Sequence, residues 1–188
     1  MLYDVRHAVA RDLHAIARNR RLTALALGYR CEGAPDFGLD RARLAVEPTP
    51  PYGILLHATA RPEKQWPEAH WIALARAVRE RGQLLLPWGS EFERARSARI
   101  AAAVEHAQMP DRQPIDRVAA LIAGASYVVG VDTGLLHLAA ALGVPLVAIF
   151  VGSEPGLTGP IGRGPIAVVG GKGELPSVDA VMRALERL

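Results

Sequence analysis

The sequence predicts an α/β fold, a Rossmann-like parallel sheet with helices on both faces. Short apolar runs alternate with helix-forming segments along most of the chain, which is typical of βαβ units. The apolar runs are nearly continuous, as expected of strands that are buried on both faces of a sheet. The chain has 188 residues, half of them hydrophobic, which suits one such domain with a short appendage.

Residues 1–50 are predicted to form an N-terminal helix and a linker. Apolar residues at spacings of three and four predict one helix face: Leu2, Val5, Val9, Leu13 and Ile16. Arginines mostly lie off that face: Arg6, Arg11, Arg18, Arg20 and Arg21. We interpret them as solvated, with contact to anionic lipid or to an acidic partner as the alternative. Residues 28–51 are rich in Gly, Pro and Asp and indicate a linker.

Residues 51–188 are predicted to form the Rossmann-like domain. Apolar runs predict strands within 52–60, 83–89, 126–131, 144–151 and 165–171. Helices are predicted within 67–82, 90–107, 114–125, 134–143 and 176–188. Their boundaries carry the expected residues, since Pro67 and Pro114 stand at helix starts and Gly82 and Gly143 at helix ends. A Gly/Pro loop is predicted at 152–164.

The run 127–152 is almost entirely apolar, yet it contains Asp132, Thr133 and His137. A membrane-spanning helix needs about 20 predominantly apolar residues, and the polar and helix-breaking residues here argue against one. The pattern favours a strand, a short helix and a second strand, and therefore a parallel sheet. Asp132-Thr133-Gly134 would then lie at the carboxyl end of a strand, where open α/β sheets bind ligands.

The Asp-Thr-Gly turn is chemically suited to a phosphate or diphosphate. A helix N-terminus offers free N–H groups and partial positive charge, and a glycine there lets an anion approach closely. Thr133 could cap the helix, and His137 lies three residues after Gly134 at the same helix end. The alternative for His137 is packing on an apolar helix face. The alternative for Asp132 is capping the helix.

Two further strand ends carry polar residues. Thr59 and Lys64 follow the first predicted strand of the domain and could supply a hydroxyl and an ammonium to a phosphate, although Lys64 could also be a surface lysine. Glu93 follows the next strand and could accept hydrogen bonds from ribose hydroxyls, or simply favour the helix dipole. Because the carboxyl ends of parallel strands share one edge of the sheet, these residues are predicted to face one crevice.

Two rival motifs fit poorly. Asp-Thr-Gly is also the aspartic-protease signature, but that enzyme needs a β-rich fold and two carboxylates that share a proton. The segment 168–174, VVGGKGE, lacks the Ser or Thr after Lys172 and the first glycine of a phosphate-binding loop. We interpret Gly170 to Gly173 as a strand-to-helix loop.

Composition excludes several classes of protein. The single cysteine, Cys31, rules out a disulfide framework and a cysteine-rich metal site, and suits a reducing cytoplasm. Charges near the N-terminus replace the apolar core of a signal peptide. The net charge is only +3 and the arginines are dispersed, so no nucleic-acid partner is expected. We expect no cofactor, and no essential metal, because there is no Asp-x-Asp motif and no His/Cys cluster.

Four segments in this order resemble the bacterial lipopolysaccharide heptosyltransferases, and within them the members that add the first heptose to Kdo of the inner core. They are HATARPEKQWPEAHW, LPWGSEFERA, AGASYVVGVDTGLLHLAAALGVP and EPGLTGPIG. The resemblance covers essentially the whole chain. It implies a GT-B glycosyltransferase of two Rossmann-like halves, whose C-terminal half holds ADP-heptose. It also implies a Kdo-lipid A acceptor, a cytoplasmic location and contact with the inner membrane.

The resemblance also implies a role for each site residue. Thr59 and Lys64 would contact the diphosphate and sugar of the donor, and Glu93 the adenosine ribose. Asp132 would contact the heptose side, and Thr133 and Gly134 the phosphates, with the family histidine at His137. One departure is Ala60, where the family often has a second threonine.

A larger departure is that no segment matches the glycine-rich N-terminal half that bears the family's catalytic aspartate. We therefore expect the donor-binding half alone, inactive by itself. Three alternatives stay open: a nucleotide-sugar-binding module without catalysis, a non-functional remnant, and another GT-B enzyme such as a sugar-nucleotide epimerase that prefers UDP-sugars.

Overall fold

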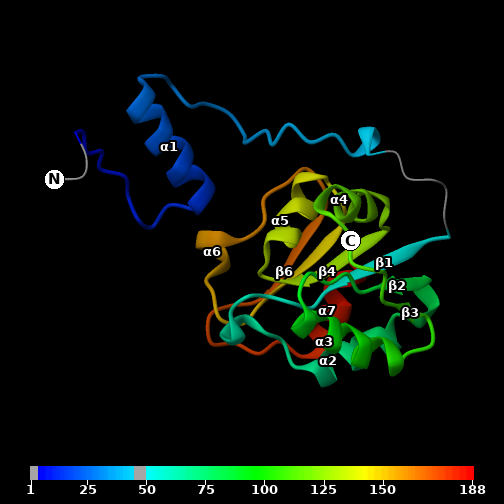
Figure 1. Ribbon diagram of the computed structural model, residues 1–188. Coiled ribbons are helices and arrows are strands. Elements are labelled where there is room, and N and C mark those ends of the chain that lie inside the picture. Colours follow the sequence, from blue (N-terminus) through cyan, green and yellow to red (C-terminus); the bar gives the residue numbers. More distant parts are fainter. Residues whose placement is uncertain (1–3, 45–49) are drawn as a thin grey trace.

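The computed structural model describes residues 4–44 and 50–188 and confirms the predicted α/β fold (Figure 1). Within these residues one sheet has six strands in the order β3-β2-β1-β4-β5-β6, and every neighbouring pair is parallel. The strands are β1 (Tyr52–Leu56), β2 (Gln83–Leu85), β3 (Ala107–Gln108), β4 (Tyr127–Val131), β5 (Leu146–Phe150) and β6 (Ile166–Gly170).

Helices cover both faces of this sheet (Figure 1). On one face lie α4 (Ile115–Gly124) and α5 (Gly134–Ala141). On the other face lie α2 (Glu68–Ala77), α3 (Glu91–Ala102) and α7 (Val178–Leu185). The central strands β1, β4 and β5 are therefore fully buried, which explains why their sequences are continuously apolar. The outer strands are less buried, and Val168 of β6 is exposed.

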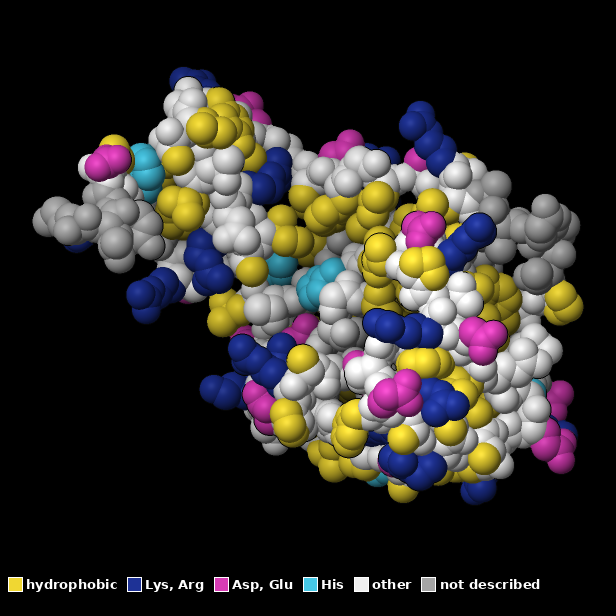
Figure 2. Space-filling view, in the orientation of Figure 1, with side chains coloured by type: hydrophobic (Ala, Val, Ile, Leu, Met, Phe, Trp, Pro, Cys, Tyr) yellow, Lys and Arg dark blue, Asp and Glu magenta, His cyan; other side chains and the backbone are white. Residues whose placement is uncertain are grey.

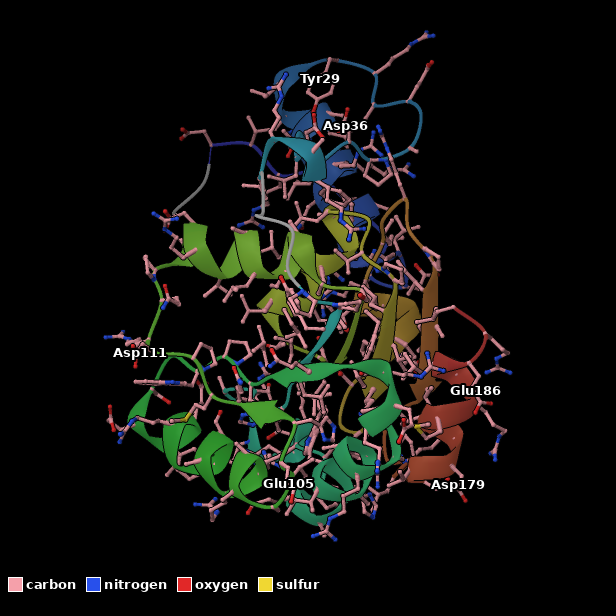
Figure 3. The ribbon with its side chains drawn as sticks, turned by 90° about the vertical axis from the view of Figure 1, so that its right-hand side faces the viewer. Tyr29, Asp36, Glu105, Asp111, Asp179 and Glu186 are labelled. Atoms are coloured by element: carbon pink, nitrogen blue, oxygen red, sulfur yellow. The ribbon has the colours of Figure 1, made fainter. Side chains whose placement is uncertain are left out.

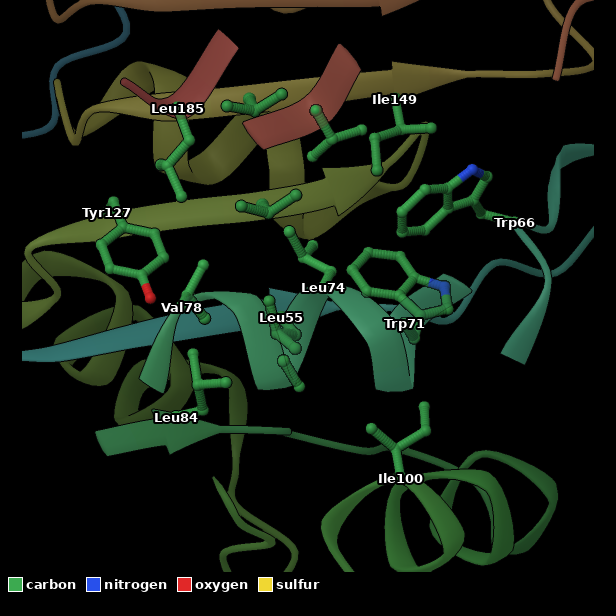
Figure 4. Packing of buried hydrophobic residues seen from close by; sticks show 14 of the residues in the cluster. Leu55, Trp66, Trp71, Leu74, Val78, Leu84, Ile100, Tyr127, Ile149 and Leu185 are labelled. Carbon is green, nitrogen blue, oxygen red and sulfur yellow. The ribbon is translucent and has the colours of Figure 1, made fainter. Parts of the chain in front are cut away.

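The core is divided by the sheet into two layers, because successive strand residues point to opposite faces. Val129 and Val131 of β4 pack toward α2, α3 and α7, whereas Val128 packs toward α4 and α5. In the first layer Trp66 and Trp71 lie edge to face with ring centroids 5.1 Å apart (Figure 4). Such a pair adds about 1 kcal/mol to the stabilisation that burial provides.

The N-terminal helix differs from its prediction. The helix α1 spans Ala15–Leu27, and the described residues before it, 4–14, contain no helix. The predicted apolar face over residues 2–16 is thus wrong, and Leu2 lies outside the described residues. Ala15–Leu27 is rich in Ala, Leu and Arg, which favour helix over the mixed segment before it. Gly28 ends α1 in the left-handed conformation, with φ +71°.

The linker after α1 runs beside the α4/α5 face (Figure 1). It contains one short 3₁₀ turn, Arg41–Arg43. The Arg41 guanidinium donates to the carbonyl oxygens of Ala123 at 2.6 Å and Ala125 at 3.0 Å, where α4 ends. The linker is therefore attached to the α/β body at this point. The boundary between residues 50 and 51 as a domain boundary stays a prediction.

Two short elements escaped prediction. The strand β3 has two residues, too few for a hydrophobic pattern to show. The helix α6 (Pro155–Thr158) forms one turn inside the predicted Gly/Pro loop. From β1 onward the other strands and α-helices lie within their predicted segments. Gly170 is the last residue of β6, and the connection from Gly171 leads to α7.

The strand order reverses between β1 and β4, which lie side by side although 70 residues, 57–126, separate them in the chain. The chain leaves β1 toward β2 and leaves β4 toward β5, in opposite directions across the sheet. The loops after β1 and β4 therefore diverge and leave a crevice at the carboxyl ends of the two strands. The polar residues that were predicted to form the site lie around this crevice.

Candidate functional site

Asp132 is the centre of a polar cluster at this crevice. It directly follows β4, and its side chain is only 7% exposed. Its Oδ2 accepts a hydrogen bond from Lys64 Nζ at 2.6 Å and another from Ser153 Oγ at 2.6 Å. The three side chains follow β1, β4 and β5, so three neighbouring strands contribute one group each. Asp132 does not cap α5, and that alternative is wrong.

The surroundings of Asp132 act on its pKa in opposite directions. Burial of the carboxyl raises the pKa, but contacts with His137, Lys64 and Ser153 lower it and prevail, so the pKa lies well below its usual range. The His137 Nε2 atom lies 3.7 Å from Asp132 Oδ1, and the His137 side chain is 39% exposed. His137 is thus beside the carboxylate and open to solvent, rather than packed into the apolar face of α5.

Lys64 is held by local structure after β1. Residues Pro62–Lys64 form a 3₁₀ turn, and the Lys64 side chain is only 19% exposed. The interpretation of Lys64 as a surface lysine is therefore wrong. Thr59, on the same loop, donates from Oγ1 to the backbone oxygen of Asp132 at 3.2 Å. Two side chains of the loop after β1 thus bind Asp132: Lys64 contacts the carboxylate of Asp132, and Thr59 contacts its backbone oxygen.

The N-terminus of α5 is open beside this cluster. Thr133 occupies the N-cap position, but its hydroxyl accepts no capping hydrogen bond. A Cβ atom added at Gly134 would meet no heavy atom within 4 Å. The backbone N–H groups of the first turn can therefore be approached by an anion, as the sequence predicted.

An apolar cavity of about 310 Å³ adjoins the cluster. Its walls come from the ends of β1 and β2, from α4 and from the start of α5: Leu56, Ala58, Pro87, Trp88, Gly89, Glu93, Gln113, Ile115, Val118, Thr133 and Leu135. The Trp88 indole donates to the Pro110 carbonyl at 2.8 Å, which sets the orientation of the ring. A cavity of this size, with few polar groups, suits a flat heterocyclic base.

A second cavity of about 230 Å³ lies next to the first, because Ala58 and Glu93 line both. Thr59, Phe92 and Arg96 are among its other walls. The structure thus brings Thr59 and Glu93 to one cavity and Glu93 and Thr133 to the other. All seven predicted site residues lie along the same crevice.

Glu93 also caps a helix, in addition to any contact with a ligand. It forms a capping box with Ser90 at the start of α3. Glu93 Oε2 accepts from the backbone N–H of Gly89 at 2.7 Å and of Ser90 at 3.1 Å. Both bonds end on Oε2, so Oε1 keeps acceptor capacity toward the cavities.

The sequence reasoning missed Ser153, Arg96 and Trp88. Ser153 had a signal, because it follows a buried strand at the same edge of the sheet as Asp132. Trp88 had the same signal after β2. Arg96 had none, since an arginine within the charged segment EFERARSAR looks solvated, and its burial depends on packing between distant elements.

No helix within residues 4–44 and 50–188 is long and apolar enough to cross a membrane. In the same part of the chain no three His, Cys, Asp or Glu residues group as metal ligands. Lys and Arg side chains are scattered over the face in Figure 2 and form no single large patch there.

Comparison with known proteins identifies relatives. The family model for glycosyltransferase family 9 (heptosyltransferase) matches residues 1–186. Lipopolysaccharide heptosyltransferase 1 of Pseudomonas aeruginosa is 46% identical over 164 residues, 86% of this chain and 46% of that protein. The Salmonella typhimurium protein of the same name is 36% identical over 184 residues, 96% of this chain and 58% of that protein. The chain spans about half the length of these curated relatives.

Solved structures of heptosyltransferases also match this chain. The E. coli heptosyltransferase WaaC with ADP superposes with a TM-score of 0.83 at 33% identity, over 98% of this chain and 60% of that chain. The same enzyme with ADP-2-deoxy-2-fluoro heptose gives a TM-score of 0.78, over 98% of this chain and 59% of that chain. The match over residues 1–186 shows that the chain belongs to glycosyltransferase family 9, the heptosyltransferase family.

Proposed function

We propose that the crevice binds ADP-heptose as the donor for heptose transfer to Kdo of the lipopolysaccharide inner core. The observation that carries the proposal is the Lys64–Asp132–Ser153 cluster at the strand-order reversal, beside an apolar cavity and an open helix N-terminus. One crevice thus offers an apolar slot, a cation with free N–H groups, and a carboxylate. These match a base, a diphosphate and a sugar. The solved E. coli heptosyltransferase WaaC with ADP-2-deoxy-2-fluoro heptose supports the choice of donor.

Each part of the donor has a place in this assignment. The adenine occupies the 310 Å³ cavity beside Trp88, and Glu93 accepts from the ribose hydroxyls through Oε1. Lys64, Thr59 and the N-terminus of α5 bind the diphosphate. Asp132, with His137 Nε2 3.7 Å from its carboxylate, is assigned to the heptose, because a carboxylate can accept hydrogen bonds from sugar hydroxyls but repels a diphosphate.

The chemistry assigned to this site is stabilisation of the leaving group. Negative charge grows on the ADP diphosphate as the bond to the anomeric carbon breaks, and Lys64 and the α5 N-terminus neutralise it. Asp132 is a weak base because its pKa is held low. We therefore assign removal of the proton from the acceptor hydroxyl to an aspartate outside these 188 residues, with direct displacement and inversion. Transfer to Kdo-lipid A at the cytoplasmic face of the inner membrane belongs to this proposal.

The test is calorimetric titration of the chain with ADP-heptose, ADP and UDP. We expect the two ADP compounds to bind and UDP not to bind. Lys64→Met should weaken both ADP compounds at least about tenfold, since it removes a charged hydrogen-bond donor. Asp132→Asn should weaken ADP-heptose but not ADP, because Asp132 faces the sugar and its charge opposes the diphosphate.

Lys172→Met is the matched control, because Lys172 is an exposed lysine on the loop before α7. It should leave both affinities unchanged. Absence of ADP binding by the folded chain, or equal binding of UDP, would contradict the proposal. An equal loss of ADP and ADP-heptose in Asp132→Asn would refute only the assignment of Asp132 to the sugar.

A further inference from the structure

We propose that Arg96 is a positioning residue of the donor site, which holds the loop 57–66 so that Thr59 and Lys64 point into the crevice. The inference rests on the proposed function for its ligand. Its structural basis is independent of any ligand, since it depends on contacts between α3 and the loop after β1.

Arg96 is a buried arginine, only 5% exposed, in the middle of α3. Its Nη1 donates to the His57 carbonyl at 3.2 Å and to Gln65 Oε1 at 3.3 Å. Its Nη2 donates to the Trp66 carbonyl. The guanidinium therefore satisfies acceptors at both ends of the loop, which its planar set of N–H donors can reach together.

The two ends of this loop are also fixed in other ways. His57 directly follows β1 and is fully buried, and Trp66 is fully buried in the core. The Trp66 indole donates to the Pro176 carbonyl at 2.9 Å. Between these fixed ends lie Thr59 and Lys64, so the separation that Arg96 imposes on the ends determines where the middle of the loop can lie.

Ser97, the residue after Arg96 on α3, also contacts His57 at the start of the loop. Ser97 Oγ lies 2.7 Å from His57 Nε2. Burial and the charge of Arg96 lower the pKa of His57 to about 4, so this imidazole is neutral at physiological pH. The contacts of Arg96 and Ser97 therefore persist across the neutral pH range.

The helix α3 connects two parts of the site. Its first turn carries Glu93, which lines both cavities. Its second turn carries Arg96, which lines the smaller cavity and holds the loop that bears Lys64. The distance between the ribose-binding and diphosphate-binding groups is thus set by one rigid helix.

Arg99 offers a matched control on the same helix. Arg99 donates to both Glu68 carboxylate oxygens at 2.8 Å, and Arg96 Nε also lies 3.9 Å from this carboxylate. The Arg99 side chain is 56% exposed, and within the described residues it makes no hydrogen bond to loop 57–66. Replacing Arg99 therefore removes an arginine and a Glu68 contact without touching the loop.

The experiment compares Arg96→Met, Arg96→Lys and Arg99→Met in the 188-residue chain. Calorimetry measures ADP affinity, thermal unfolding measures stability, and hydrogen exchange reports on amides 58–65. Arg96→Met should speed hydrogen exchange in 58–65 and weaken ADP binding at least about tenfold, because Thr59 and Lys64 would no longer be held in position to contact the ligand. Arg96→Lys keeps the charge but not the fork of donors, and should show the same losses in a folded chain. Arg99→Met should change neither the ADP affinity nor the exchange in 58–65.

A double-mutant cycle asks whether Arg96 acts through Lys64. If it does, Arg96→Met should weaken ADP less in a Lys64→Met background than in the wild type. Additive losses, or normal exchange in 58–65 of the Arg96 variants, would overturn the inference. A wild-type chain that binds no ADP would instead refute the proposed function, and the exchange comparison would still decide whether Arg96 holds the loop.

Discussion

Asp132 shows how one residue can be costly to bury and still stable in its charged form. An isolated buried carboxylate is unfavourable, but here Lys64 and Ser153 each donate to Oδ2 at 2.6 Å. Lys64 is therefore paired with Asp132. Under the proposed function, a diphosphate would compete with Asp132 for this ammonium, while Ser153 could keep its bond to the carboxylate. The charges of Lys64 and Asp132 balance within this pair, so a bound diphosphate would replace one anionic partner of Lys64 by another.

The low pKa of Asp132 predicts how stability depends on pH. A pKa that is lower in the folded chain than in the unfolded chain adds stability above the unfolded value, about 3.9, and this stability is lost as pH falls toward the folded value. Wild type should exceed Asp132→Asn by about 2 kcal/mol in the free energy of unfolding at pH 7. The difference should be constant from pH 8 to about 5 and shrink below about 4. Urea unfolding at a series of pH values measures it.

Asp116→Asn is a suitable comparison, because Asp116 is exposed in the first turn of α4. It should change stability little at any of these pH values. A wild-type advantage over Asp132→Asn that grows as the pH falls below 4 would contradict the assigned direction of the pKa shift.

At the scale of elements, the site depends on close contact between two loops. The loop after β5 contains Gly152, and a Cβ atom added there would clash with the Glu63 carbonyl oxygen. Glu63 is part of the 3₁₀ turn that ends at Lys64, and Ser153 follows Gly152. The absence of a side chain at residue 152 therefore lets Lys64 and Ser153 converge on Asp132.

We predict that Gly152→Ala separates these loops. The clash is with backbone, so the 3₁₀ turn must shift, at a cost of about 1–3 kcal/mol in the free energy of unfolding. ADP-heptose affinity should fall as well, because Lys64 moves with the turn. Gly156→Ala is the control, since its Cβ would meet nothing nearer than Glu154 Oε1 at 3.8 Å. Unchanged stability and affinity in Gly152→Ala would show that the contact can relax without moving Lys64.

At the scale of the whole molecule, the described N-terminal residues are peripheral to the core. Tyr29 and Asp36 lie at one end of the molecule and Glu105 at the other, with the sheet between them (Figure 3). Both core clusters consist of described residues from Tyr52 onward, with Leu44 packed at the margin of one. The helix α1 is tied to the body by His14 Nε2, which donates to the Gly159 carbonyl at 3.0 Å.

This arrangement predicts that residues 51–188 fold without residues 1–50. The shortened chain should lose about 1–3 kcal/mol in the free energy of unfolding, chiefly from the Arg41 hydrogen bonds to the end of α4. Its ADP affinity should equal that of the full 188 residues, because no predicted donor-binding residue precedes Thr59. Denaturant unfolding and calorimetry test both statements. A shortened chain that fails to fold cooperatively would place the domain boundary elsewhere.

Local sequence patterns were sufficient to predict the class of fold and most of the elements. Strands buried on both faces need continuous apolar runs. Helix ends favour residues such as Ser90 and Gly143. Both features can therefore be recognised from residues that are close together in the chain. The sequence also placed Asp132, Thr133 and Gly134 at a strand end. Local patterns failed for α1, where apolar spacing over residues 2–16 competed with the stronger helix propensity of Ala15–Leu27.

The hydrogen-bond partners of the site residues depend on contacts between segments that are distant in the chain. Lys64 and Asp132 are 68 residues apart in the chain and meet because β1 and β4 are neighbours in the sheet. Ser153 joins them because β5 lies beside β4, and Arg96 is buried because α3 packs over the loop after β1. Strand order and helix packing bring these groups together through contacts between distant segments. Hydrophobic periodicity describes only neighbours along the chain, so it identifies the residues at a strand end but not the atoms they bind.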